Sequence, residues 1–502
     1  MPGRMEFNIA LPRAGDAKAT QRDSGSPMRL LVLGDFSGKP AATRTPLAQR
    51  ATHRVDVDNI DDVLRRLATR LEFLAVGAAN PAAEIDFSSL DDFHPDRLYA
   101  QVNLFRALRD MRARLQDPAR FAAAAAELQQ TAVLPAIAEA APAQPAQAAT
   151  AADLDLLGSL LGKPAGGLQT PPAAAAVAPH AAAGIDALIR GIVAPHIVRD
   201  APPFQAQYLA SVDMATGETM RALLHDPAFQ SLESAWRGVM WLISSLELDE
   251  NLELHLFDVS RDELRADVVA AKGQVTMTGL HRALADRWRN TPDGQGWTVL
   301  AGLYSFGPSD ADIGLLAALG LIASQAGGPL LAAGDTALAG DDAKALAGWN
   351  ALRRSEAAPW IGLAAPRVLL RLPYGKGSDP IAAFAFEEMP GTPEHEGFLW
   401  GNGSLAVALL IGRAFTAAGG WDFEPGDERE IGDLPAFTFL QGGERELQAC
   451  AEQYLGEQGG NALLAAGLMP VMSHRHANAV TVMRFQSVAE PAAALAGPTR
   501  VA

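Results

Sequence analysis

The residues that could carry chemistry in this chain do not fall into spacings that build a catalytic or metal site. His474 and His476 stand two apart, so on a strand both would face one side. That suits a metal only if carboxylates converge there, but Arg475 separates the pair and no acidic residue lies nearby in sequence. An exposed loop is the simpler interpretation. His395, in Pro393-Glu-His-Glu396, is interpreted as part of an exposed acidic loop.

Two adjacent carboxylate pairs, Asp91-Asp92 and Glu387-Glu388, are candidates for acid–base work. Adjacent side chains diverge on a helix or a strand, so neither pair alone makes a dyad. The first pair sits where a helix is predicted to begin and suits its positive end. The second is expected to form ion pairs, with Arg367 or Arg371 as partner.

Glycine-rich stretches give no stronger signal. Leu33-Gly-Asp-Phe-Ser-Gly-Lys39 shares letters with a phosphate-binding loop but lacks its spacing, and Pro40 follows the lysine. Gly401-Asn-Gly403 lacks the third glycine of a dinucleotide fingerprint and is interpreted as a tight turn. We therefore expect no catalytic residue, no cofactor, no metal and no small-molecule substrate, and hence no enzyme.

The elements in the first part of the chain alternate between strand and helix. An apolar run at 29–33 ends in Gly34-Asp35 and predicts a buried strand followed by a turn. A helix is expected from Asp58 or Asn59 to Leu67, and a strand over 84–87. After a cap at 89–92, one helical stripe is predicted to continue through a set of apolar residues: Leu98, Val102, Phe105, Leu108, Met111 and Leu115.

The second part repeats this alternation. Helix is expected over most of 187–246, over 262–269, over 278–288, from a Ser309 cap to Ala326, and over 405–418. Apolar strands are predicted at 253–259, 297–304, 329–333 and 368–372. Alternating strands and helices with apolar strands predict an α/β fold with mixed sheets flanked by helices.

Composition divides the chain into two units and a linker. We expect one domain at 1–130, a disordered Ala/Pro-rich linker at 131–183, a second domain at 184–490 and a flexible tail at 491–502. A tether of this kind fixes a one-to-one ratio of the two domains and raises their effective concentration. Within the linker, residues 153–162 carry an apolar helical face made of Leu154, Leu157, Leu160 and Leu161. This face either docks on its own protein or serves as a partner motif.

The densest aromatic group surrounds Trp236. Leu232, Trp236 and Val239 share a helix face, and Glu233 and Arg237 have the spacing of an ion pair. Trp236 and Arg237 are residue types enriched at interfaces, although a core position for Trp236 and Leu232 is the preferred interpretation.

Bulk properties exclude several classes of function. The chain has 502 residues and a formal charge of −17, which argues against nonspecific binding to nucleic acid or anionic lipid. Its single cysteine, Cys450, excludes an internal disulfide and a cysteine-based zinc site. The N-terminus lacks the pattern of a secretion signal, and no apolar run is long enough to span a membrane, so a cytoplasmic protein is expected.

Motifs in both parts resemble one family. The N-terminal part resembles the small sheath subunit of the contractile bacterial type VI secretion system, through Leu31-Val-Leu-Gly-Asp-Phe-Ser-Gly38, Val55-Asp-Val-Asp-Asn-Ile60 and Leu90-Asp-Asp-Phe-His-Pro-Asp-Arg97. The C-terminal part resembles the large sheath subunit, through six segments that occur in the family's order: 225–238, 310–316, 366–375, 398–402, 434–439 and 467–471.

This resemblance implies a structural subunit of a cytoplasmic contractile tube. In that family, small and large subunits pair and polymerise around an inner tube, and a ring ATPase recycles the spent sheath. The resemblance therefore implies sheath subunits as partners, together with inner-tube and baseplate proteins and the ATPase. It also points to Leu154–Leu161 as an ATPase-binding helix.

The chain departs from the family pattern in three ways. Its two subunits are fused, the region before Phe229 is short and Ala/Pro-rich, and the chain stops soon after Ser487. We expect the C-terminal strands that knit neighbouring subunits to be missing, which leaves Glu6–Leu11, with Phe7 and Ile9, as the candidate donor strand. Two interpretations remain open: a fused sheath protomer that polymerises, and an accessory protein that caps a sheath end or the baseplate.

Overall fold

The structure, a computed structural model, describes residues 25–73, 83–129, 205–291, 294–391, 393–475 and 477–497. It divides into two compact units. The first contains the residues up to Val102 and those from Met220 onward, and the second is Asn103–Thr219. This division differs from the domains at 1–130 and 184–490 expected from composition, because strands from both ends of the chain share one sheet. The expected linker at 131–183 lies outside the described residues.

A mixed sheet forms the centre of the first unit. In the described part of the chain, nine strands are arranged in the order β11-β15-β14-β8-β7-β6-β1-β5-β2. The strands from β14 to β5 in this order run parallel, whereas β2, β15 and β11 are antiparallel to their neighbours. The bounds are β1 Met28–Gly34, β2 His53–Val55, β5 Leu252–Asp258, β6 Val299–Phe306, β7 Leu330–Gly334, β8 Ile361–Ala365, β11 Glu430–Ile431, β14 Leu468–Ser473 and β15 Val480–Val482.

Strand β1 occupies an interior position of this sheet although it comes from the N-terminal part. On one side it pairs with β5, from Met28 opposite Leu252 to Gly34 opposite Asp258. On its other side it pairs with β6, where Leu30 lies opposite Val299. Interior strands of parallel sheets are apolar on both faces, which explains the run Leu30-Leu-Val-Leu33. The N-terminal part therefore supplies an interior strand to a sheet whose neighbouring strands, β5 and β6, come from the C-terminal part.

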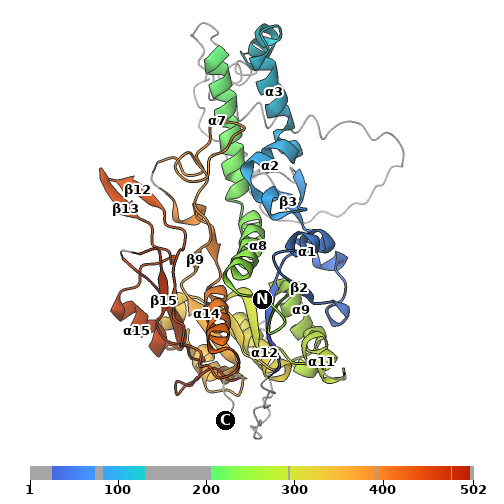
Figure 1. The fold of residues 1–502 in the computed structure, drawn as a ribbon, viewed down its shortest axis with the longest axis vertical. Coiled ribbons are helices and arrows are strands. Elements are labelled where there is room, and N and C mark those ends of the chain that lie inside the picture. The colour runs from blue at the N-terminus through green and yellow to red at the C-terminus, as the bar shows by residue number, and fades with distance from the viewer. Residues whose placement is uncertain are drawn as a thin grey trace, which may run out of the picture. The chain divides into compact units, whose positions relative to one another are not determined.

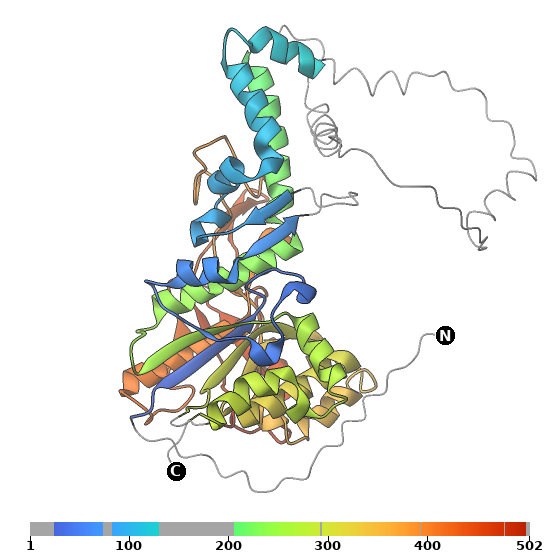
Figure 2. The same cartoon turned by 90° about the vertical axis from the view of Figure 1, so that its right-hand side faces the viewer.

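Helices cover both faces of the sheet (Figures 1 and 2). Helices α9 (Arg261–Ala270) and α12 (Asp310–Ala326) join the core that contains Leu31 and Leu33 of β1. Helix α14 (Gly403–Ala418) packs on β6, β7 and β8 and contacts α8 (Pro227–Ser245). Burying the sheet between two helical layers gives the α/β architecture predicted from the alternation of elements.

The remaining helices of the first unit are short: α1 Ile60–Leu67, α2 Pro95–Gln101, α10 Gly279–His281, α11 Arg287–Arg289, α13 Ala347–Arg353 and α15 Glu457–Ala465. A π-helical turn, Arg282–Asp286, joins α10 to α11. Three two-stranded sheets complete the unit: β3 Arg70–Phe73 with β4 Ala83–Asp86, β9 Val368–Leu369 with β10 Trp400–Gly401, and β12 Thr438–Gln441 with β13 Glu444–Leu447.

The second unit is helical in its described part. Helix α3 (Arg106–Gln116) and helical residues 121–129 lie with α7 (Gln205–Leu224), the last residues of which belong to the first unit. Arg112 Nε is 2.7 Å from Asp213 Oδ1, and Gln205 Nε2 donates to the carbonyl of Leu115 at 2.8 Å. Near the same end of α7, Gln129 Nε2 donates to the Tyr208 hydroxyl at 2.6 Å. Residues 129 and 205, which flank the undescribed segment, therefore both bind within this unit.

Several predicted elements are confirmed, and the predicted helix through Val102 is wrong. The predicted strands at 29–33, 84–87 and 253–259 correspond to β1, β4 and β5, and the helix with a Ser309 cap is α12. The single helical stripe from Leu98 to Leu115 is instead split into α2, a 3-10 turn and α3. The break falls at Val102, which is extended (φ −75°, ψ 129°) and buried. Among the described residues, no helix is long and apolar enough to cross a bilayer.

Candidate functional site: the junction of the N-terminal and C-terminal parts

Trp236 joins α8 to the turn that follows β1. Its indole Nε1 donates to the carbonyl of Phe36 at 3.0 Å, and the two rings meet edge to face with centroids 5.4 Å apart. The side chain is fully buried, as the core interpretation of this residue predicted. A buried indole with a hydrogen-bond partner stabilises a contact by burying apolar area, and its hydrogen bond fixes the orientation of the ring. Trp236 therefore fixes the N-terminal turn against the C-terminal part.

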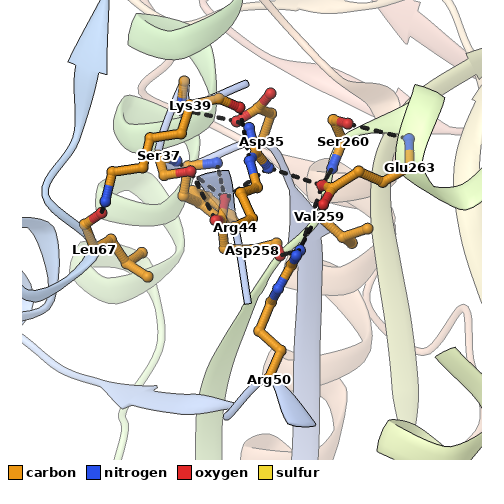
Figure 3. A network of polar contacts seen from close by, with 12 residues as sticks. Asp35, Ser37, Lys39, Arg44, Arg50, Leu67, Asp258, Val259, Ser260 and Glu263 are labelled. Atoms are coloured by element: carbon orange, nitrogen blue, oxygen red, sulfur yellow. Dashed lines mark hydrogen bonds and ion pairs between the residues drawn. The ribbon is translucent and has the colours of Figure 1, made fainter. Parts of the chain in front are cut away.

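Asp258, at the carboxyl end of β5, holds the same turn from the other side (Figure 3). One of its oxygens accepts hydrogen bonds from the backbone amides of Phe36 at 2.8 Å and Ser37 at 3.0 Å. The other accepts from the Ser37 hydroxyl at 2.8 Å. Gly38 completes the turn at φ +63°, where a Cβ would lie 2.1 Å from the carbonyl oxygen of Arg70. Only glycine fits this position without displacing the backbone.

Two arginines of the N-terminal part reach carboxylates of the C-terminal part (Figure 3). Arg44 contacts Asp35 at 2.6 Å, Glu263 at 3.0 Å and Asp258 at 3.5 Å, and its side chain is only 3% exposed. Arg50 contacts Glu263 at 2.8 Å. A buried guanidinium is costly unless it is paired, and here the pairing carboxylates come from both parts. Removing one partner would leave an uncompensated charge inside the protein.

The charges at this junction shift one another's pKa values. Burial opposes the charged form of Arg44, but the carboxylates of Asp258, Asp35 and Glu263 outweigh it and raise the pKa of Arg44. Burial also opposes the charge of Glu263, yet the hydrogen bond from Arg50 and the nearby charges hold its pKa below the ordinary value. For Asp35, burial prevails over Arg44 and raises its pKa. The ion pairs of Arg44 and Arg50 with Glu263 thus provide the electrostatic attraction between the N-terminal and C-terminal parts.

A second buried charge cluster fixes α8 to the loop that follows β9. Arg371 contacts Glu233 and Glu388, each at 2.8 Å. Arg237 contacts Glu233 at 2.6 Å, as its i,i+4 spacing predicted, and donates to the Tyr374 hydroxyl at 2.7 Å. Burial opposes the charge of Glu388, but chiefly the charge of Arg371 lowers its pKa to about 2. Glu388 therefore forms the ion pair expected with Arg371.

The loop held by this cluster also contacts the N-terminal part. Asp96, in α2, accepts hydrogen bonds from the backbone amides of Ala382 at 3.1 Å and Ala383 at 3.0 Å. The rings of Tyr99 and Phe384 lie with centroids 5.0 Å apart. The junction thus extends from the sheet to this loop, with polar and aromatic contacts at both places.

Other candidate residues in the described ranges have hydrogen-bond or ion-pair partners within the protein. His395 Nε2 lies 3.0 Å from Glu452, which also pairs with Arg367, and His474 Nε2 lies 2.6 Å from the Thr481 hydroxyl. Asp92 accepts backbone hydrogen bonds from residues 88 and 89, so it caps a turn. No group of three metal-ligating side chains occurs in the described ranges. Phe7, Ile9, Leu154, Leu157, Leu160 and Leu161 lie outside them.

Sequence reasoning missed most of the polar residues of the junction. It predicted no contact or function for four of them: Asp258, Arg44, Arg50 and Asp96. Only Glu263 carried a local signal, because Ser260-Arg-Asp-Glu263 has the spacing of a capping box, which the structure forms. The arginines lie in a loop without periodicity, and their partners are about 200 residues away in sequence.

Comparisons with known proteins match both parts separately. Residues 206–489, more than half of the chain, match the VipB family, described as a tail sheath N-terminal domain, and residues 12–134 match the type VI secretion system VipA family. The chain is 29% identical over 304 residues to the type VI secretion system sheath protein TssC1 of Pseudomonas aeruginosa, covering 57% of this chain and 61% of that protein. It is 32% identical over 95 residues to the sheath protein TssB1 of the same organism, covering 18% of this chain and 55% of that protein.

The chain thus spans between half and two thirds of the length of each of these relatives. The VipA-like match contains β1 and the two arginines, and the VipB-like match contains β5, Asp258 and Glu263. The chain belongs to the VipB tail sheath family and carries a VipA-like part fused to it, as its motifs indicated.

Proposed function

We propose that this protein is a structural subunit of a cytoplasmic type VI secretion sheath, which assembles with itself or with homologous sheath subunits and turns over no substrate. The observation that carries this proposal is the position of β1 between β5 and β6, which places a strand of the VipA-like part inside the sheet of the VipB-like part. Fusion then supplies both parts in a fixed one-to-one ratio.

The β12–β13 hairpin supports assembly through strand addition. In the part that the structure describes, this sheet has two strands, so both of its outer edges are unpaired. Leu440 is 69% exposed and Leu447 is 39% exposed, and both stand on the same face, since Thr438 pairs with Leu447 and Leu440 with Arg445. Exposed edges with apolar side chains are templates for another strand. We propose that residues 6–11 of a neighbouring subunit, with Phe7 and Ile9, supply it.

Electron microscopy of the purified protein tests the proposed assembly. A polymerising protomer gives long tubes, whereas discrete particles would favour the accessory capping protein. Leu440→Asp should shorten or abolish the tubes while leaving the Tm unchanged, because the substituted side chain is exposed in the folded protein. Val57→Asp is the matched control, since Val57 is 66% exposed and lies outside the hairpin. Equal loss of tubes in both variants would contradict a specific role for the hairpin.

Further partners are proposed on the family resemblance. Inner-tube and baseplate proteins would contact an assembled sheath, and the recycling ATPase would bind the apolar face of residues 153–162. Replacing Leu157 and Leu160 by Ala should abolish capture of the ATPase in a pull-down from purified components. Unchanged capture would remove this segment as the binding site without affecting the proposal of sheath assembly.

A further inference from the structure

Trp421 holds the chain at the point where the described N-terminal residues begin. Its indole Nε1 donates to the carbonyl of Ser26 at 2.7 Å, and its buried ring meets Phe415 edge to face with centroids 5.2 Å apart. Residues 1–24, which precede the described part, therefore join the first unit beside Trp421. The loop that leads to β11 starts directly after this tryptophan.

Strand β11 forms one edge of the central sheet. It pairs with β15 on one side, and no strand in the described part of the chain pairs with its other side. An unpaired edge exposes backbone donors and acceptors that another segment can bind. Because β11 contains only Glu430 and Ile431, side chains around it must supply much of any such contact.

The loop and β11 carry carboxylates in excess. Five of them form no salt bridge with another described residue: Asp422, Asp427, Glu428, Glu430 and Asp433. All are exposed except Glu428, which is half-buried. The cations beside them are Arg429 in the loop and Arg484, which precedes Phe485, whose ring lies against Gly426. We call these five carboxylates and the outer side of β11 the acidic edge. An excess of one charge favours a partner of the opposite charge.

Residues 12–22 have the opposite charge to the acidic edge. They contain Arg13, Lys18 and Arg22, with Asp16 as the one acidic residue, in a chain with a net charge of −17. When extended, a segment of this length spans about 36 Å. Strand β11 is the sixth strand from β1 in the sheet order, which corresponds to about 29 Å at the usual spacing of strands. The segment is therefore long enough to follow the loop from Trp421 to β11.

We propose that residues 12–22 dock on the acidic edge of their own chain, with Arg13, Lys18 and Arg22 facing its carboxylates. Only residues 23–25 separate this segment from the contact at Ser26, so its effective concentration at the edge is high and favours docking within one chain over docking on a second copy. Docking would cover an edge of the central sheet that could otherwise pair with another protein. The inference rests on charge, reach and the unpaired edge, and does not depend on the proposed sheath function.

Hydrogen–deuterium exchange of the full chain at low ionic strength tests the docking. Replacing the three cations by Gln (Arg13→Gln, Lys18→Gln and Arg22→Gln) should speed exchange in residues 422–433 by about threefold or more, because an undocked edge is open to solvent. The matched control removes three exposed cations far from this loop in sequence: Arg66→Gln, Lys272→Gln and Arg282→Gln. Exchange in 422–433 should stay at the wild-type rate in the control. Equal rates in both variants would overturn the proposal.

Carbodiimide cross-linking distinguishes docking within one chain from docking between chains. This reagent joins a lysine to a carboxylate in contact with it, so Lys18 should be linked to residues 422–433 in peptides identified by mass spectrometry. In an equal mixture of ¹⁵N-labelled and unlabelled chains, each linked pair should carry one isotope only. Pairs of mixed isotope would show that the segment binds a second copy and would overturn docking within the chain, as would the absence of any link from Lys18 to this surface.

Discussion

At the scale of residues, a few buried charges connect segments that lie far apart in sequence. Asp258 accepts three hydrogen bonds from the turn after β1. In the opposite direction, Arg44 and Arg50 of the N-terminal part form ion pairs with Glu263 of the C-terminal part. Hydrogen bonds to charged groups are worth more than neutral ones, and an unpaired partner left buried costs more still. The junction should therefore be sensitive to substitutions that remove a charge while conserving shape.

Asp258→Asn tests this sensitivity. The amide keeps one acceptor but loses the charge facing Arg44 and places a donor near the backbone amides of residues 36 and 37. We expect the free energy of unfolding to fall by roughly 2 kcal/mol, measured by urea denaturation followed through tryptophan fluorescence. Asp341→Asn, at an exposed residue, should change it little. Equal stability of the two variants would show that Asp258 does not hold the turn.

The pH dependence of the free energy of unfolding should reveal the contribution of the ionised Glu388 carboxylate. Its pKa in the folded protein is about 2, below the ordinary value of 4.5, so its contribution is present above pH 4.5 and is lost as the pH falls toward 2. A depression of this size corresponds to about 3 kcal/mol. Glu388→Gln should lower stability at pH 7 and flatten the decline between pH 4.5 and 2, measured by urea midpoints.

Glu446→Gln provides the comparison for that experiment, because Glu446 is exposed. Its stability should follow the wild-type curve at every pH. A Glu388→Gln curve that runs parallel to the wild-type curve would contradict the assignment, since the acid loss would then come from other carboxylates such as Glu263, the pKa of which is also lowered.

At the scale of elements, β1 determines whether the central sheet is continuous. It is paired on both sides and contributes Leu31 and Leu33 to one core, whereas β5 and β6 are not paired with each other in the described sheet. The sheet of the VipB-like part is therefore incomplete without a strand of the VipA-like part. Side chains on β1 should contribute to stability as interior core residues do.

Val32→Ala measures that contribution. Val32 is fully buried in β1, so losing two methyl groups and leaving a cavity should lower the free energy of unfolding by about 2 kcal/mol. The same substitution at Val57, which is exposed in the same N-terminal part, should cost little. Chemical denaturation of both variants gives the comparison, and an equally small effect at Val32 would place β1 outside the core.

Local elements could be predicted from sequence where one pattern dominated. Helix α12 has Ser309 as its cap and a uniformly apolar body, and β1 is an unbroken apolar run before a turn. The predicted helix through Val102 failed because this residue is held extended, which a periodic pattern does not reveal. The predicted strand at 368–372 shortened to two residues, because Arg371 turns into the buried charge cluster instead of continuing a ladder.

The candidate junction could be predicted only in part, because sequence patterns reveal local contacts but not contacts between residues far apart in sequence. Trp236 and the Glu233–Arg237 pair follow from helical spacing, which is local. The pairing of β1 with β5 joins residues more than 200 apart, and composition alone places them in different domains. The ion pairs of Arg44 and Arg50 could not be predicted before that strand pairing was known, because it brings Asp258 and Glu263 beside them.

At the scale of the whole molecule, the VipA-like and VipB-like parts of the chain share the central sheet of the first unit. The undescribed segment leaves after residue 129 and returns before residue 205, and both of these residues bind within the helical unit. The connection therefore does not need to hold the sheet together once the protein has folded. Cutting it should leave the shared sheet and the buried charges intact.

Specific proteolysis of the connection tests the shared sheet most directly. A protease site inserted between Thr150 and Ala151 allows the folded chain to be cut, and size-exclusion chromatography in native buffer then reports whether the two fragments separate. The shared sheet predicts that they co-elute with an unchanged tryptophan spectrum and separate only in denaturant. Fragments that elute apart as folded, independent proteins would contradict the account.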